Sequence, residues 1–175
     1  DFSRDKDGNG AVVMFAELAA YAASKGLTVA GLLDEVYCDI GFFMERNESV
    51  VFEGAAGAAQ IQKLADSYGA NPPKEVDGSA VISVRDFRKP GIVDEEGEAV
   101  STEKMLFVDL ADGRSFAVRP SGTEPKIKYY MLGRQTAAAG QKLTAAELAA
   151  AKEKVSAALA SMWEKLRADI DVRLV

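Results

Sequence analysis

Residues 115–132, SFAVRPSGTEPKIKYYML, decide the fold, because they contain two strands and the turn that joins them. Residues 115–118 form the first strand, which leads into the turn. The second strand alternates between apolar side chains that suit a core and polar side chains that suit the opposite face. The two sets are Ile127, Tyr129 and Met131 against Lys126, Lys128 and Tyr130. One face of the sheet is therefore predicted to be buried, and the other can project charge beside the turn.

The turn itself, Arg119–Pro125, has the composition of an anion-binding loop. Arg119 offers a planar fork of N–H donors that matches two phosphate oxygens at once. Ser121 and Thr123 add hydroxyl donors. Gly122 can take a positive φ, which would let consecutive backbone N–H groups turn inward as an anion nest. Together these features predict a small phosphate site.

The neighbouring residues favour the same interpretation. Pro120 and Pro125 fix φ on either side of the turn, and Lys126 follows on the next strand. Glu124 is expected either to orient Arg119 or to accept a hydrogen bond from a ligand hydroxyl. Turn composition alone is equally compatible with a tight turn that binds nothing.

Composition limits the classes of function. The chain has 175 residues, 48% of them hydrophobic and 27% charged, with a formal net charge of −6. Scattered basic residues in an acidic chain argue against a nucleic-acid surface. No apolar run approaches the ~18 residues of a membrane span and no signal peptide is recognisable, so we expect no membrane partner and a cytoplasmic location. Without histidine, and with Cys38 as the one cysteine, a zinc site is not expected. Cys38 is predicted to be a buried thiol.

The segment Asp5–Gly10, DKDGNG, matches the first half of an EF-hand calcium loop. Asp5, Asp7 and Asn9 would supply ligands. The twelfth position, where calcium needs a bidentate glutamate, is Ala16. A calcium-binding domain is therefore a weaker interpretation than a structural or substrate-facing use of this segment.

Periodicity and capping signals divide the rest of the chain into helices and strands. Helices are predicted for residues 11–25, for 29–40 after a cap at Thr28, for 53–68 with Gly69 closing, and after a capping box at Thr144–Glu147. Strands are predicted for 42–52 with a possible turn at 46–48, for 79–88, and for 105–110 with both faces buried. The sum is an α+β fold, an antiparallel sheet with helices packed mainly on one face.

Two further observations concern the N-terminus. The helix at 11–25 is apolar on two faces, and both faces of such a helix are expected to pack against other parts of the protein. The sequence also begins without methionine. We therefore expect this chain to be part of a longer one.

The run Arg119–Lys128, RPSGTEPKIK, resembles the C-terminal phosphate-binding loop of the α-D-phosphohexomutases, the family of phosphoglucomutase and phosphomannomutase. Arg4–Gly8, RDKDG, is similar to the segment that begins the last part of that family's third domain. The family's catalytic serine loop, metal loop and sugar loop have no counterpart in this sequence. The resemblance implies the C-terminal part of a larger enzyme. Residues 1–41 would be a helical remnant of the preceding α/β domain, and residues 42–175 the C-terminal phosphate-binding domain.

The resemblance also implies a function. The intact enzyme would interconvert hexose 1-phosphate and hexose 6-phosphate through an upstream serine, with Mg²⁺ and a hexose 1,6-bisphosphate activator. This part would bind the phosphate that is not reacting and help to close the active site. The implied partners are a small phosphosugar and the upstream domains of the same chain. The match favours glucose, although the loop that decides the sugar lies outside this sequence.

The residues that the resemblance assigns to the substrate phosphate are Arg119, Ser121, Gly122, Thr123 and Lys126, with Lys6 and Glu124 as further substrate contacts. It assigns no catalytic residue and no metal ligand, so the isolated chain is expected to be inactive. The alternative is a stand-alone module that binds a phospho-ligand without catalysis. The uncovered apolar helix argues against that alternative.

Overall fold

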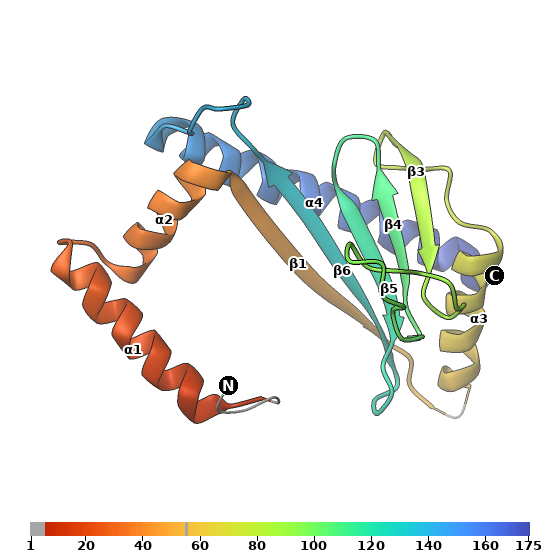
Figure 1. Ribbon diagram of the computed structural model, residues 1–175. Coiled ribbons are helices and arrows are strands. Elements are labelled where there is room, and N and C mark those ends of the chain that lie inside the picture. Colours follow the sequence, from red (N-terminus) through yellow and green to blue (C-terminus); the bar gives the residue numbers. More distant parts are fainter. Residues whose placement is uncertain (1–5, 55) are drawn as a thin grey trace. The chain divides into compact units, whose positions relative to one another are not determined.

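The computed structural model describes residues 6–54 and 56–175 (Figure 1). The helices are α1 (Gly8–Ser24), α2 (Val29–Ile40), α3 (Gly57–Ala70) and α4 (Ala145–Leu174). The strands are β1 (Phe42–Val51), β2 (Glu75–Val76), β3 (Ser79–Asp86), β4 (Leu106–Leu110), β5 (Ser115–Pro120) and β6 (Lys126–Gln135).

The chain divides into two compact units. One consists of Asp1–Phe42 with Thr136–Ala151, and the other of Phe43–Gln135 with Lys152–Val175. We call the second the sheet unit. The predicted family domains, residues 1–41 and 42–175, stay a prediction.

Local capping residues set the first two helices. The Asp7 carboxylate accepts the N–H of Gly10 at 2.9 Å, so α1 begins three residues before the predicted start at residue 11. Gly26, with φ of 73°, ends this helix in the left-handed region. The hydroxyl of Thr28 accepts the N–H of Gly31 at 3.0 Å, which confirms the predicted cap of α2.

These two helices leave large apolar side chains exposed. On α1 they are Val12, Val13, Met14, Phe15, Leu18 and Tyr21, and on α2 Leu33, Val36 and Ile40. Cys38 is half-buried, so the prediction of a buried thiol is wrong. The reason is that the unit containing α2 leaves much of the surface of this helix open. Within the described part of the chain, no single helix passes the length and composition test for a membrane span. Only α1 and α2 together do, as a pair bent by 83°.

The sheet has the strand order β1-β6-β5-β4-β3-β2, and its ladders from β2 to β6 are antiparallel. β6 therefore lies between the first strand and the hairpin of β4 and β5. β1 runs straight through the turn that was considered at residues 46–48. Arg46 and Glu48 lie on the same side of this strand, two residues apart, and form an ion pair at 2.8 Å.

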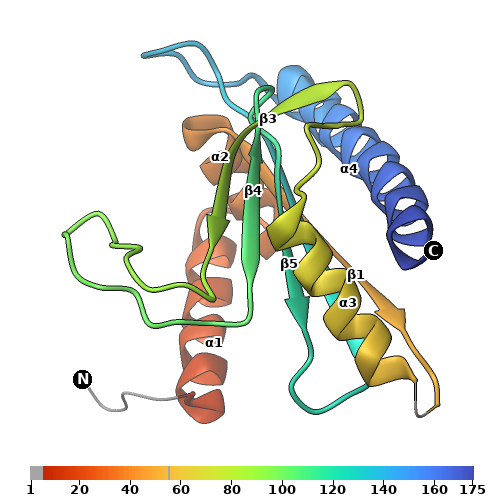
Figure 2. The ribbon, with the colours of Figure 1, turned by 90° about the vertical axis from the view of Figure 1, so that its right-hand side faces the viewer.

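The core lies on one face of the sheet, under α3 and α4 (Figures 1 and 2). The ring of Tyr129 on β6 packs against Tyr68 of α3 at 6.1 Å and against Trp163 of α4 at 5.5 Å between centroids. Burial raises the pKa of Tyr68 and of Tyr129 above the ordinary tyrosine value. This arrangement confirms the predicted α+β class, and Trp163 is a packing residue.

The predicted alternation of β6 is also confirmed, and α4 carries a buried apolar stripe. The buried stripe consists of Leu148, Val155, Leu159, Met162, Leu166 and Ile170. The capping box at the start of α4 is present, since the Glu147 carboxylate accepts the N–H of Thr144 at 2.8 Å. At Gly133 the helix and the strand approach so closely that a β-carbon would meet Val155 Cγ1 at 2.9 Å.

Two predicted elements are wrong in detail. α3 begins at Gly57 and continues through Gly69, which was expected to end it. The guanidinium of Arg88 lies where a side chain at position 69 would be, so this glycine leaves room for the arginine. β4 was expected to be buried on both faces, but Phe107 is half-exposed and packs under the guanidinium of Arg85 at 4.5 Å.

Candidate phosphate-binding turn

The turn between β5 and β6 is closed by its own backbone. The N–H of Ser121 donates to the carbonyl of Lys126 at 2.9 Å, and the N–H of Lys126 donates to the carbonyl of Glu124 at 2.7 Å. The carbonyl of Pro125 accepts the N–H of Phe52, just after β1, at 2.8 Å. The turn is therefore tied both to itself and to the neighbouring edge strand.

These bonds leave the tip of the turn open. In the described part of the chain, the backbone N–H groups of Gly122, Thr123 and Glu124 have no hydrogen-bond partner. Gly122 does not have the positive φ that the sequence suggested, because the two backbone bonds close the turn without it. A β-carbon at position 122 would meet nothing within 4 Å.

Arg119 is presented to solvent. Its side chain is 48% exposed, and its recorded contact is one ion pair at 3.2 Å with Glu103, which lies in the segment before β4. No second hydrogen bond from this guanidinium is present among the described residues. Most of its N–H groups are therefore free to bind a ligand.

Glu124 does not orient Arg119, contrary to one of the two roles expected for it. Its carboxylate forms an ion pair with Lys126 at 2.7 Å. The hydrogen bond from Lys126 holds the pKa of Glu124 below the ordinary glutamate value. The place expected for Glu124 is taken by Glu103, which sequence reasoning missed. The only available signal was that Glu103 lies two residues before the strand predicted at 105–110.

The turn gathers positive charge on the face opposite the core. Arg119 on β5 stands directly across from Lys128 on β6, and like charges in this position repel each other. Lys128 forms no ion pair within the described part of the chain. Ser121 is half-buried and Thr123 exposed, and neither hydroxyl has a described hydrogen-bond partner. An anion at this point would relieve the repulsion and satisfy the donors.

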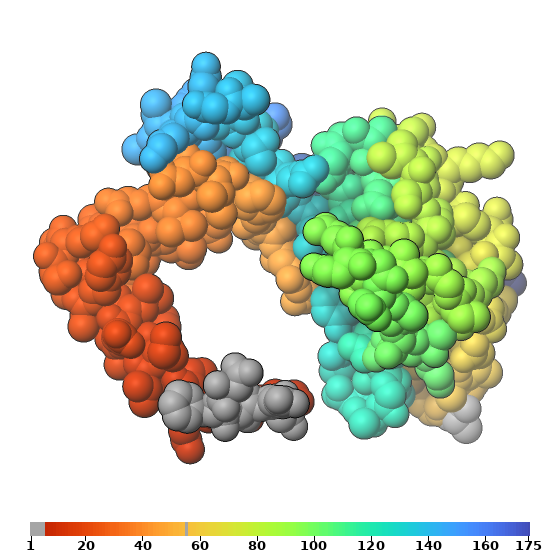
Figure 3. Space-filling model, viewed as in Figure 1, coloured from red at the N-terminus to blue at the C-terminus, as the bar shows by residue number. Residues whose placement is uncertain are grey.

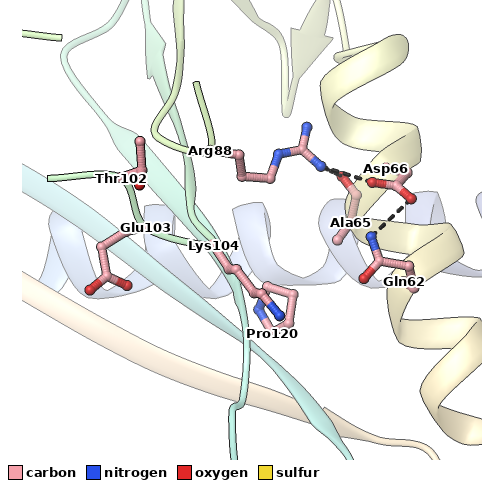
Figure 4. Close-up of a pocket in the computed structure, with 8 residues that line it drawn as sticks. All are labelled: Gln62, Ala65, Asp66, Arg88, Thr102, Glu103, Lys104 and Pro120. Atoms are coloured by element: carbon pink, nitrogen blue, oxygen red, sulfur yellow. Dashed lines mark hydrogen bonds and ion pairs between the residues drawn. The ribbon is translucent and has the colours of Figure 1, made fainter. Parts of the chain in front are cut away.

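A pocket of about 420 Å³ lies beside the turn, between α3 and the segment before β4 (Figure 4). Pro120 forms part of its wall. The arginine in this pocket, Arg88, is already engaged by Asp86 at 2.7 Å and by Asp66 at 3.0 Å. The hydrogen bonds from Arg88 hold the pKa of Asp86 below its ordinary value. Arg88 is therefore a structural cation, in contrast to Arg119.

The remaining predicted site residues lie at the N-terminus. Lys6 is exposed just before α1, and its predicted contact with substrate stays a prediction. Asp5, the first residue of the calcium pattern, lies outside the described residues. Asp7 serves as the cap of α1, and Asn9 and Gly10 are part of that helix. Asp7 therefore has a structural use as a helix cap.

Known proteins match most of this chain in sequence. The family description "Phosphoglucomutase/phosphomannomutase, C-terminal domain" matches residues 50–151. A phosphoglucomutase of Staphylococcus haemolyticus is 33% identical over 135 residues, which are 75% of this chain and 25% of that protein. A phosphoglucomutase of Staphylococcus epidermidis is 31% identical over 134 residues, with 74% and 24% covered.

This chain therefore spans about a quarter of the length of the curated relatives that it matches. Among solved structures, the open form of the Paramecium phosphoprotein parafusin, a phosphoglucomutase, covers 87% of this chain and 26% of its own length. Its sequence identity is 17% and the TM-score is 0.47.

Proposed function

Because this chain belongs to the phosphoglucomutase/phosphomannomutase family, we propose that its β5–β6 turn binds the phosphate group of a phosphosugar that is not being transferred. The whole protein would interconvert hexose 1-phosphate and hexose 6-phosphate. Closure of this part over the substrate would exclude water from the reacting phosphoryl group.

The observation that carries this proposal is the state of Arg119. The guanidinium is exposed, uses one described contact, and stands directly opposite Lys128. Next to it, the turn offers the N–H groups of Gly122–Glu124 and the hydroxyls of Ser121 and Thr123. A phosphate dianion needs this combination of a bidentate cation and short-range donors.

The proposed role of this site is positioning. The proposed site contacts only phosphate oxygens, so either end of a hexose bisphosphate fits. Its residues are Arg119, Ser121, Gly122, Thr123 and Lys126. Fixing the distal phosphate aligns the reacting phosphoryl group for in-line transfer.

Magnesium is implied by the family, and its chemistry would be to support the phosphoryl-transferring group. In the described part of the chain, no cluster of three or more His, Cys, Asp or Glu side chains could hold a metal ion. The described residues do not fit a magnesium site, and we assign none of them to it. The bisphosphate activator, the inactivity of the isolated chain and a cytoplasmic location likewise stay predictions.

The apolar surface of α1 fits a contact with the upstream domains of the parent chain. Met14, Phe15, Leu18 and Tyr21 line one hollow on this surface. The relatives are about four times as long as the matched part, so the parent would have enough chain to cover it. We propose that these side chains are buried in the full-length protein. Hydrogen exchange of α1 that is equally fast in the full-length protein and in this chain would contradict the assignment.

The phosphate site is tested by Arg119→Ala. In the full-length enzyme we expect kcat/KM to fall by about 100-fold or more, since a charge-assisted bidentate contact is lost. Arg85→Ala is the matched control, because Arg85 is 46% exposed and makes a comparable ion pair with Asp109 at 3.2 Å. Equal kcat/KM for the Arg119→Ala variant and the wild type would overturn the assignment.

A second measurement uses this chain alone. Backbone amide shifts are followed by NMR while inorganic phosphate or glucose 1-phosphate is added. We expect shifts concentrated at residues 119–126 and absent from Arg119→Ala. Shifts spread evenly over the surface would indicate nonspecific binding and contradict a built site.

A further inference from the structure

Glu103 is the unexpected residue at the phosphate-binding turn, and its backbone is held in place. The N–H of Glu103 donates to the carbonyl of Phe87 at 2.9 Å, and the N–H of Phe87 donates to the carbonyl of Met105 at 3.0 Å. These bonds extend the pairing of the two strands beyond Asp86 at the end of β3 and Leu106 at the start of β4. The position of the Glu103 backbone is therefore set by the sheet.

From this position the carboxylate reaches Arg119. The contact joins Arg119 Nη2 to Glu103 Oε2 at 3.2 Å, and the Glu103 side chain is 54% exposed. Figure 3 shows the segment before β4, in green, next to the teal atoms of the β5–β6 turn. A single exposed ion pair of this length is weak. It is also longer than the 2.7–2.9 Å typical of strong charge-assisted bonds.

A phosphate bound to Arg119 would compete with this carboxylate. A bidentate phosphate needs two N–H groups of the guanidinium and brings two negative charges. A carboxylate that stayed in contact with the same guanidinium would lie within a few ångströms of that dianion and repel it. The side chain of Glu103 is exposed, so it can turn to solvent when phosphate arrives.

We propose that Glu103 is the counter-ion of the ligand-free site, which phosphate replaces at Arg119, and that it thereby lowers the affinity of the turn for phosphate. This inference rests on the proposed function. It also gives a reason for weak phosphate binding at this site. A turn that must accept each end of a bisphosphate in succession has to release its phosphate readily, and Glu103 re-forms the ion pair when it does. Glu124, paired with Lys126, is the corresponding carboxylate within the turn itself.

The test is an NMR titration of this chain with inorganic phosphate, comparing the wild type with Glu103→Gln. Glutamine keeps the size of the side chain and removes its charge. We expect phosphate to bind two- to about fivefold more tightly, the range set by the strength of an exposed ion pair. The control is Glu98→Gln, which changes the net charge equally. Glu98 is exposed and lies in the loop between β3 and β4. This substitution is expected to leave the affinity unchanged.

The possible outcomes separate this inference from the proposed function. Equal or weaker binding by Glu103→Gln, with normal binding by the wild type, would overturn the exchange; weaker binding would show that Glu103 orients Arg119. If Glu98→Gln tightens phosphate binding equally, the effect comes from net charge alone, and the proposed exchange is overturned too. If neither the wild type nor Glu103→Gln binds phosphate, the phosphate site itself fails, and the exchange with it. A misfolded variant would not gain affinity, so tightening cannot be mistaken for structural damage.

Discussion

Two arginines lie at opposite ends of β5, and the structure holds them in different ways. Arg114, just before the strand, is 11% exposed and contacts Asp77 at 2.6 Å, Asp112 at 2.7 Å and the carbonyl of Ala158 at 3.0 Å. Arg119, near the other end, is 48% exposed and has one described contact at 3.2 Å. The strand between them is the same, so the difference comes from what surrounds each end.

Arg114 connects three elements and has almost no donor left for a ligand. Asp77 lies in the turn between β2 and β3, Asp112 in the turn before β5, and Ala158 on α4. Ser161 of α4 also donates to Asp77, at 2.7 Å. Arg119 connects little and keeps its donors. The comparison shows that the number of N–H groups already in use separates a structural arginine from a binding one more clearly than sequence position does.

The largest effect on stability is expected from Arg114→Met. The substitution leaves Asp77 as a half-buried carboxylate without its cation, so we expect unfolding to require about 2–4 kcal/mol less free energy. Urea denaturation measures this loss. Phosphate binding at the other end of β5 should persist under conditions where the variant is folded, and its loss would contradict the separation of the two roles.

The double variant Asp77→Asn/Arg114→Met sharpens this result. Removing the carboxylate's charge should recover part of the stability lost in Arg114→Met, because the uncompensated charge is then gone. Strictly additive losses would mean that the two side chains do not interact energetically.

A smaller effect is expected from acid. Partial burial would raise the pKa of Asp77, but hydrogen bonds from Arg114 and Ser161 outweigh it, so the pKa lies below the ordinary value. Burial would also raise the pKa of Asp112, but hydrogen bonds from Arg114 outweigh it, so this pKa lies below the ordinary value too. A depressed pKa in the folded state stabilises the protein above the unfolded pKa of about 3.9, and this contribution disappears as the pH falls through the folded value.

The unfolding free energies of the wild type and Arg114→Met should therefore converge as the pH is lowered below about 4. Denaturation midpoints at several pH values, measured side by side, follow the convergence. A gap that stays constant down to about pH 2 would show that the carboxylates are not the source of the stability difference.

The smallest effect on stability is expected from Gly122→Ala. Its added methyl group meets nothing and the position lacks a positive φ, so unfolding should change by less than about 0.5 kcal/mol. If phosphate lies against the backbone of the turn, the same methyl group obstructs it, and a several-fold loss of phosphate affinity is expected. Unchanged affinity would exclude backbone contact at this residue.

Signals that act within one element could be predicted from the sequence. The caps at Thr28 and at Thr144–Glu147 involve partners three residues away, and both are present. The alternation of β6 has a period of two and needs no knowledge of neighbouring strands. The position of the turn between β5 and β6 was predicted for the same reason, since the residues that form it are adjacent in the sequence, while phosphate binding there stays a prediction.

Contacts between distant segments could not be predicted in the same way. The continuation of α3 through Gly69 depends on Arg88 crossing that position. The exposure of Phe107 depends on Arg85 from the next strand. Glu103 reaches Arg119 only through the register of the strands that position both residues. Each is set by side chains far apart along the chain, which the local pattern does not contain.

The close approach at Gly133 limits how this sheet can be redesigned. A glycine inside a strand normally invites replacement by a β-branched residue, because such residues favour strands. Here even a methyl group would press on Val155 and Leu159 and lift α4 away from β6. A consensus or propensity-based stabilisation of this protein should therefore leave position 133 unchanged, since the absence of a side chain there sets the spacing between helix and sheet.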